Sequence, residues 1–211
     1  MINKLIDHIE NSLIKTDNYE SKITDEILKM EGMSGRKTRH FYNNICSMEN
    51  ARYLEIGCWK GSSLCSAMCN NRMSCLGIDN WLTLGGPKQD FINNFIKFRG
   101  SNNASYIEKN CWEIDVSTIG KFNIYMYDGN HTETSHYQAL NHYYSCLDDE
   151  FIYLVDDWNW EKVKTGTLNS IQDNKLKIEF KKEFFTDKDP GVQQSNNDWH
   201  NGLCIFVLSK I

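Results

Sequence analysis

Short apolar runs alternate with helix-like segments between residues 51 and 172, and this alternation restricts the fold more than any other feature of the chain. The apolar runs predict buried strands at 53–56, 74–78, 104–107, 122–127 and 151–155. The spacing between them predicts helices over 62–70, 88–98, 136–146 and 162–172. Strands that alternate with helices form parallel sheets covered on both faces, so we expect an α/β, doubly wound architecture.

The last two apolar runs depart from this alternation. They cover 175–185 and 202–209 and are joined by a polar loop without helical spacing. This arrangement predicts an antiparallel hairpin at one edge of an otherwise mostly parallel sheet.

The first part of the chain has helical spacing throughout. We therefore expect an N-terminal helical extension or lid over 1–48, followed by the main domain over 49–211. The run Met33-Ser34-Gly35 interrupts the spacing, and Ser34 is expected to cap a helix over 36–48.

The composition of the chain excludes several classes of protein. With 211 residues, a net charge of −5 and a pI near 5.7, the chain lacks the basic balance of most nucleic-acid-binding proteins. No apolar stretch reaches membrane-spanning length, and no secretory segment opens the sequence. We therefore expect a cytoplasmic protein that has neither nucleic acid nor a membrane as its partner.

The eight cysteines do not have the spacing of a zinc site or a disulfide framework. No Cys-x-x-Cys pair occurs, and several cysteines, such as Cys75, Cys146 and Cys204, lie in apolar runs. These thiols are expected to pack as small hydrophobic side chains.

A glycine turn follows the first predicted strand, in the pattern Glu55-x-Gly57-x-x-x-Gly61. Glycines let a backbone turn tightly and approach a ligand closely. The pattern lacks the middle glycine that dinucleotide pyrophosphates require, which favours a cofactor without that group. Asp79 ends the second strand, where an acidic side chain typically binds ribose hydroxyls. A plain tight turn is the alternative interpretation.

Acidic residues follow the fourth and fifth predicted strands. Asp128 comes directly after the fourth strand, and Asp156 and Asp157 follow the fifth. Parallel strands place their carboxyl ends at one edge of the sheet, where ligands bind. Carboxylates gathered there repel one another unless a cation neutralises them, and hard oxygen ligands suit Mg²⁺. The alternative is that these aspartates cap the following helices.

Several separated motifs together resemble the class I S-adenosylmethionine-dependent methyltransferases, which have a Rossmann-like fold. The likeness is greatest to the metal-dependent O-methyltransferases grouped with macrocin O-methyltransferase and the so-called cephalosporin hydroxylases, and catechol O-methyltransferase resembles the chain more distantly. It covers about residues 33–160 and rests on Leu54-Glu55-Ile56-Gly57, Gly61-Ser62-Ser63, Asp79, Asp128-Gly129-x-His131 and Asp156-Asp157.

The resemblance implies a binding site for S-adenosylmethionine. The methionine and ribose part would be lined by Glu55, Gly57, Gly61, Ser62 and Ser63, with Met33, Ser34 and Gly35 covering the methionine end. Asp79 would bind the ribose, Asn80 and Trp81 would lie beside the adenosine, and Asp128 would be shared with the metal site. Asn110 and Cys111 stand where the family has an acid and a serine near the adenine.

The resemblance also implies a metal-assisted reaction. Asp128, Asp156 and Asp157 would hold Mg²⁺ or a similar divalent cation, and His131 would be the general base. Some related enzymes place an aspartate where this chain has Asn130, which cannot accept a proton. A histidine that caps the next helix is the alternative interpretation of His131.

The expected activity is transfer of a methyl group to a hydroxyl of a small molecule, with a sugar or a vicinal diol as the acceptor class. Trp81, Trp158 and Trp160 are candidates for a substrate wall, although core packing is expected to explain at least one of them. Residues 82–88 and 186–200 are candidates for mobile lids. An NAD-type oxidoreductase and a non-catalytic binding protein on the same fold are the alternatives, and a homo-oligomer is left open.

Overall fold

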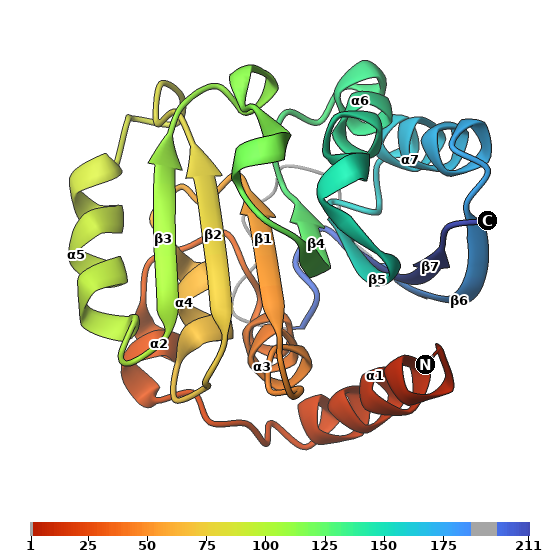
Figure 1. Cartoon of the computed structure of the whole chain (residues 1–211). Coiled ribbons are helices and arrows are strands. Elements are labelled where there is room, and N and C mark those ends of the chain that lie inside the picture. Colours follow the sequence, from red (N-terminus) through yellow and green to blue (C-terminus); the bar gives the residue numbers. More distant parts are fainter. Residues whose placement is uncertain (1, 187–197) are drawn as a thin grey trace.

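In the computed structural model, which describes residues 2–186 and 198–211, a seven-stranded sheet of order β3-β2-β1-β4-β5-β7-β6 runs through the protein (Figure 1). The strands are β1 (Arg52–Ile56), β2 (Ser74–Asp79), β3 (Asn103–Glu108), β4 (Phe122–Tyr127), β5 (Leu147–Asp156), β6 (Lys177–Phe184) and β7 (Leu203–Ser209). The first five pair in parallel. The predicted doubly wound α/β architecture is therefore confirmed.

The predicted antiparallel edge hairpin is confirmed, and its second strand enters the sheet. β7 pairs antiparallel with β6 on one side and with β5 on the other. The pairing with β5 begins where Leu203 lies opposite Asp156. Residues just before β7 are thereby brought to the carboxyl end of β5, which is the edge where the predicted site lies.

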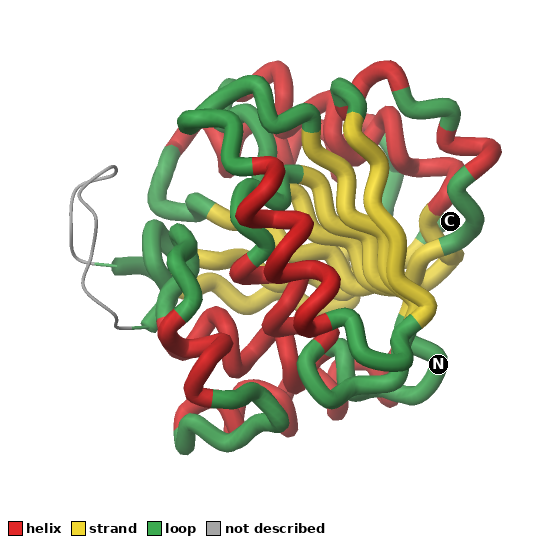
Figure 2. The backbone as a smooth tube through the Cα atoms, turned by 90° about the vertical axis from the view of Figure 1, so that its left-hand side faces the viewer, coloured by secondary structure: helices red, strands yellow, loops and turns green. Residues whose placement is uncertain are grey.

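Helices cover both faces of the sheet (Figure 2). They are α4 (Ser62–Met68), α5 (Lys88–Phe98), α6 (Glu133–Tyr143) and α7 (Glu161–Asp173), with short 3₁₀ turns at Cys111–Glu113, Val116–Thr118 and Tyr144–Cys146. Alternate residues of β4 belong to different cores. Ile124 and Met126 pack with α4 and α5, whereas Tyr125 and Tyr127 pack with α6 and α7. This alternation is the two-residue period of a strand with both faces buried.

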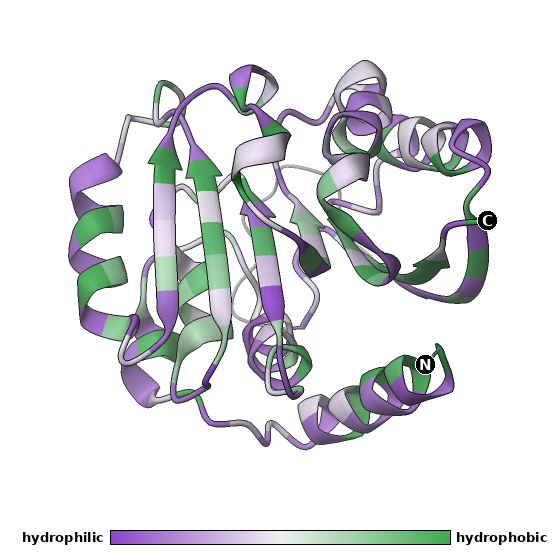
Figure 3. Ribbon diagram, in the orientation of Figure 1, coloured by the Kyte–Doolittle hydropathy of each residue, from purple (hydrophilic) through white to green (hydrophobic). Residues whose placement is uncertain are grey.

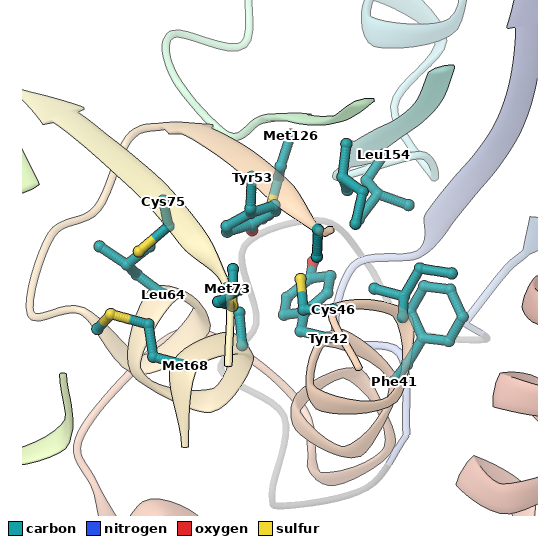
Figure 4. Close-up of a cluster of buried hydrophobic side chains, with 14 of the residues drawn as sticks. Phe41, Tyr42, Cys46, Tyr53, Leu64, Met68, Met73, Cys75, Met126 and Leu154 are labelled. Atoms are coloured by element: carbon teal, nitrogen blue, oxygen red, sulfur yellow. The ribbon is translucent and has the colours of Figure 1, made fainter. Parts of the chain in front are cut away.

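Three N-terminal helices share the first of these cores. They are α1 (Ile2–Asp17), α2 (Asp25–Lys29) and α3 (Arg36–Ile45). Leu5, Ile9, Ile27 and Phe41 are buried in the same cluster as the sheet, and Figure 4 shows Phe41 with Leu154 nearby. In Figure 3, α1 and α5 carry hydrophobic and hydrophilic residues in alternation, as expected of helices with one buried face.

The predicted cap of α3 is wrong. Gly35 occupies the cap position, and the helix ends at Ile45. The Ser34 hydroxyl instead forms a hydrogen bond with the Ser62 hydroxyl at 2.9 Å and accepts one from Arg39 Nε at 3.0 Å. The Ser34 side chain, which the local sequence pattern predicted as a helix cap, is therefore used for tertiary contacts instead.

Seven of the eight cysteines are buried, and Cys111 is partly exposed. Burial raises the pKa of Cys75 to about 12, as expected of a thiol that packs among apolar neighbours. In the described part of the chain, no helix combines the length and the apolar character needed to cross a membrane.

Candidate active site

A cavity of about 520 Å³ opens at the carboxyl ends of β1, β2 and β4. Its lining includes nine of the residues predicted for the site: Met33, Gly57, Asp79, Asn80, Trp81, Asn110, Cys111, Asp128 and His131. The strand order reverses at β1, because β2 and β3 lie on one side of it and β4 and β5 lie on the other. Open α/β sheets form a crevice at such a point, which explains why these residues are grouped. The cavity is therefore at the position where open α/β sheets bind ligands.

The glycine turn between β1 and α4 is pressed against the end of β4. Gly57 has φ +90°, and a Cβ there would lie 1.9 Å from the carbonyl oxygen of Asp128. The Gly57 amide donates to Ile78 O at 2.9 Å. Gly61, at φ +86°, begins the turn into α4. Only glycine allows both the left-handed conformation and the close approach at Gly57.

The Asp79 carboxylate ties this turn to the next strand. Its Oδ2 accepts hydrogen bonds from the amides of Cys58 and Trp59, each at 2.8 Å. Its Oδ1 accepts from the amide of Trp81, also at 2.8 Å. A carboxylate has about four acceptor positions, so about one remains for a ligand in the cavity.

Six of the predicted cofactor residues lie outside the cavity lining and support it: Ser34, Gly35, Glu55, Gly61, Ser62 and Ser63. Glu55 is fully buried, accepting from Tyr53 Oη at 2.6 Å and from Ser63 Oγ at 2.7 Å. Gly35 packs against the carbonyl oxygen of Asp198, which a Cβ would approach to 2.0 Å. The Glu55 carboxylate is thus held by Tyr53 and Ser63 behind the turn, and its contact with a cofactor stays a prediction.

Replacing Glu55 with glutamine is expected to change how stability depends on pH. Burial raises the pKa of Glu55 from 4.5 to about 7, although hydrogen bonds from Tyr53 and Ser63 oppose the shift. The unfolded chain releases this proton first, so the free energy of unfolding falls as the pH rises from about 4.5 to about 7. Glu55→Gln should remove about 3 kcal/mol of that loss, measured by urea unfolding at pH 4.5 and 8.

The exposed Glu113 gives a matched control for this measurement. Glu113→Gln should leave the pH dependence of unfolding unchanged. An unaltered pH profile in Glu55→Gln would contradict the assignment of the buried proton to Glu55.

An acidic cluster lies at one side of the cavity. Asp128, His131 and Asp157 each offer an atom within 4.8 Å of the others. His131 Nε2 lies 3.2 Å from Asp157 Oδ2, while Asp156 Oδ1 accepts from the Asp157 amide at 3.0 Å. The three-residue group differs from the predicted ligand set, since His131 stands in it where Asp156 was expected.

Electrostatics in this cluster are unfavourable to the ionised carboxylates. Burial, followed by repulsion from Asp156 and Asp157, raises the pKa of Asp128 well above its ordinary range. Burial and Asp157 raise the pKa of Asp156 in the same way. Asp157 also has φ +56°, a conformation that is strained for a residue with a side chain. Crowded oxygens of this kind fit a divalent cation, which would relieve their repulsion.

The sequence did not indicate that Asn201 belongs to this cluster. Its Nδ2 donates to Asp157 Oδ1 at 2.7 Å across 44 positions of the chain. His200, next to it, has its pKa lowered by burial, although Asp157 opposes the shift. Lys109, Trp112 and Tyr127 also line the cavity without having been predicted. No local motif in the sequence marks these residues. Asn201 reaches the cluster because β7 pairs with β5.

The three predicted wall tryptophans have different environments. Trp81 lines the cavity. Trp160 lies beside His131, with the ring centroids 5.1 Å apart. Trp158 is fully buried and donates to Glu183 at 2.7 Å, so core packing explains this tryptophan and it is not a wall residue. Of the predicted lids, 82–88 contributes Thr83 and Leu84 to the cavity, whereas 187–197 lies outside the described residues.

Comparison with known proteins adds likeness of structure rather than of sequence. No family model matches the chain. No curated protein matches it either. Solved structures do match, at identities that show the fold alone.

Three of these structures illustrate the likeness. A protein from Streptococcus mutans, provisionally described as a SAM-dependent methyltransferase, has a TM-score of 0.57 at 11% sequence identity. The match covers 82% of this chain and 48% of that protein's chain. Precorrin-6y C5,15-methyltransferase from Geobacter metallireducens has a TM-score of 0.56 at 14% identity, and the match covers 83% of this chain and 88% of that one. An SAH-bound methyltransferase from Podospora anserina has a TM-score of 0.54 at 13% identity, and the match covers 96% of this chain and 86% of that one.

The chain spans about half the length of the first two structures it matches, 50% and 48%. Its likeness to them concerns the sheet and the helices around it. The chain therefore has the Rossmann-like fold of these methyltransferases.

Proposed function

We propose that this chain transfers a methyl group from S-adenosylmethionine to a hydroxyl oxygen of a small molecule, assisted by a divalent cation. One observation carries the proposal: the cavity beside the glycine turn and the acidic cluster share Asp128 and His131. Donor and acceptor would then lie side by side at the carboxyl ends of β1 and β4. Methyl transfer demands such positioning above all.

The cavity offers a suitable group for each part of the donor. Asp79 keeps an acceptor position that would suit the ribose hydroxyls. Trp81, Trp112 and Cys111 would lie around the adenine, where apolar faces bury a flat base. Gly57 would line the methionine end, and Met33 would cover it.

The acidic cluster would hold the cation through Asp128 and Asp157, with Asp156 remaining a predicted ligand. When bound, a divalent cation supplies positive charge that favours the ionised form of an acceptor hydroxyl. Asp128 and Asp157 would orient the acceptor oxygen toward the donor. A sugar or vicinal diol, which presents two neighbouring oxygens, is the acceptor class we propose, rather than a nucleic acid.

His131 would accept the acceptor's proton at Nε2. This nitrogen faces Asp157 Oδ2 at 3.2 Å and would be released when that carboxylate engages a cation. The ring of Trp160, at 80° to the imidazole, would hold its plane. In the transfer, the S–CH₃ bond breaks and the O–CH₃ bond forms. The products are the methyl ether, SAH and a proton on His131.

His131→Gln is expected to lower methyl transfer by about 10²–10⁴-fold, because the acceptor loses its base. SAH affinity should stay within about threefold, since His131 is assigned to the acceptor side of the cavity. Mass spectrometry of sugars and phenols incubated with S-adenosylmethionine measures the transfer, and isothermal titration measures the affinity. His8→Gln, on α1, is the matched control.

The same titration separates the alternatives. Binding of NAD without SAH would favour an oxidoreductase and overturn the proposal. Binding of SAH with no methylated product from any hydroxyl compound would favour a non-catalytic binding protein. Methyl transfer that persists undiminished in EDTA would remove the cation from the proposal and leave the rest.

A further inference from the structure

Asn201 places a buried amide against the acidic cluster. The residue is 7% exposed, and its Nδ2 donates to Asp157 Oδ1 at 2.7 Å. The other oxygen of that carboxylate faces His131. Asn201 and His131 therefore hold the two oxygens of Asp157 from opposite sides.

The other end of this amide has no partner. Asn201 Oδ1 is buried and accepts no hydrogen bond from any of the residues that the structure describes. Leaving a buried acceptor unsatisfied is unfavourable, by about 1–3 kcal/mol. In this orientation the amide is satisfied, within the described part of the chain, only at its Nδ2 end, so rotating it breaks no hydrogen bond at Oδ1.

The backbone fixes Asn201 in this position. Its carbonyl oxygen accepts from the Asn159 amide at 2.9 Å, and the carbonyl of Gly202 accepts from the Trp158 amide at 3.3 Å. Gly202 has φ +92°, and a Cβ there would meet Asn159 Oδ1 at 2.6 Å. These two bonds to the residues that follow Asp157 hold the backbone of Asn201 and Gly202 at the end of β5, so a rotation of the Asn201 side-chain amide requires no change in the backbone.

We propose that Asn201 is a further ligand of the divalent-cation site, through Oδ1, and this rests on the proposed function. Oxygen and nitrogen exchange places when a side-chain amide rotates by half a turn about its Cβ–Cγ bond. In the cation-free protein, the NH₂ group neutralises part of the charge on Asp157. A cation held by Asp128 and Asp157 would repel the NH₂ group and attract the oxygen. Neutral amide oxygens are ordinary ligands of hard cations.

Manganese affinity tests this proposal without reference to activity. Mn²⁺ binding to the whole chain is measured by electron paramagnetic resonance, with neither donor nor acceptor present. Asn201→Ala should weaken Mn²⁺ binding about tenfold or more, by loss of a ligand oxygen. Asn201→Asp should bind Mn²⁺ at least as tightly as the wild type, because a carboxylate can ligate although it cannot donate to Asp157. If Asn201→Ala unfolds, Asn201→Asp still tests the proposal, because aspartate has nearly the same shape as asparagine.

Asn159→Ala is the matched control, since the Asn159 side-chain amide bonds Thr186 and, within the described ranges, makes no hydrogen bond to Asp157. It should leave Mn²⁺ affinity unchanged. A crystal soaked in Mn²⁺ should show Oδ1 within about 2.2 Å of the ion. Unchanged affinity in Asn201→Ala, or an NH₂ group still on Asp157 beside the ion, overturns the inference while the proposed function stands. A wild-type chain that binds no Mn²⁺ overturns it too, and intact methyl transfer then shows that only the cation was wrong.

Discussion

Asp128→Asn is expected to lower methyl transfer by about a thousandfold or more while SAH affinity stays within about threefold. The carboxylate of Asp128 lies at the meeting point of the cavity and the acidic cluster. Asparagine has nearly the same shape but lacks the charge that would hold a cation near the acceptor. A thousandfold loss corresponds to about 4 kcal/mol of transition-state stabilisation.

The same substitution is expected to make the cation-free protein more stable at neutral pH. Burial and the neighbouring aspartates raise the pKa of Asp128, so ionising it costs the folded state stability as the pH rises above the unfolded value. An amide at this position removes that cost. For a chain of this size, each kcal/mol gained raises Tm by about 2–4 °C. Loss of activity together with a higher Tm distinguishes a missing charge from misfolding.

Steady-state rates by mass spectrometry and thermal unfolding between pH 5 and 8 measure these two effects. Asp7→Asn, an exposed position on α1, is the control and should change neither. A variant at Asp128 that keeps its rate within tenfold, together with a wild type insensitive to EDTA, would contradict the role of the cation.

The sheet could be predicted because its strands are continuous apolar runs. β4, for example, matches the predicted 122–127 at both ends, since all six of its residues are buried. Helix ends were less accurate. α6 begins at Glu133 because Thr132 caps it, accepting from the Ser135 amide at 3.1 Å, whereas the apolar spacing predicted a start at 136.

The cavity could be predicted where motifs stand at strand ends, and the acidic cluster could be predicted less completely. Gly57 and Asp128 directly follow β1 and β4, and Asp79 ends β2, so their meeting depends on strand order alone. Asn201 depends on β7 lying beside β5, which a list of predicted strands does not specify. Glu55 belongs to the glycine motif, yet its strand position turns it toward Tyr53 and Ser63.

Gly57→Ala is expected to destabilise the protein by about 3–5 kcal/mol and to weaken SAH binding. About 1–2 kcal/mol comes from holding a residue with a Cβ at φ +90°. The remainder comes from overlap with the Asp128 carbonyl oxygen at 1.9 Å, which belongs to backbone and cannot rotate away. Total stabilities of about 5–15 kcal/mol make such a loss large.

Gly120 separates the two contributions, because it has nearly the same backbone conformation without the overlap. Its φ is +88°, and in the described residues no atom lies within 4 Å of a Cβ built there. Gly120→Ala should therefore lose only about 1–2 kcal/mol in urea unfolding and keep its SAH affinity. Equal losses in the two variants would mean that the turn after β1 can move away from β4. The close approach of Gly57 to Asp128 would then not be what joins the donor cavity to the acidic cluster.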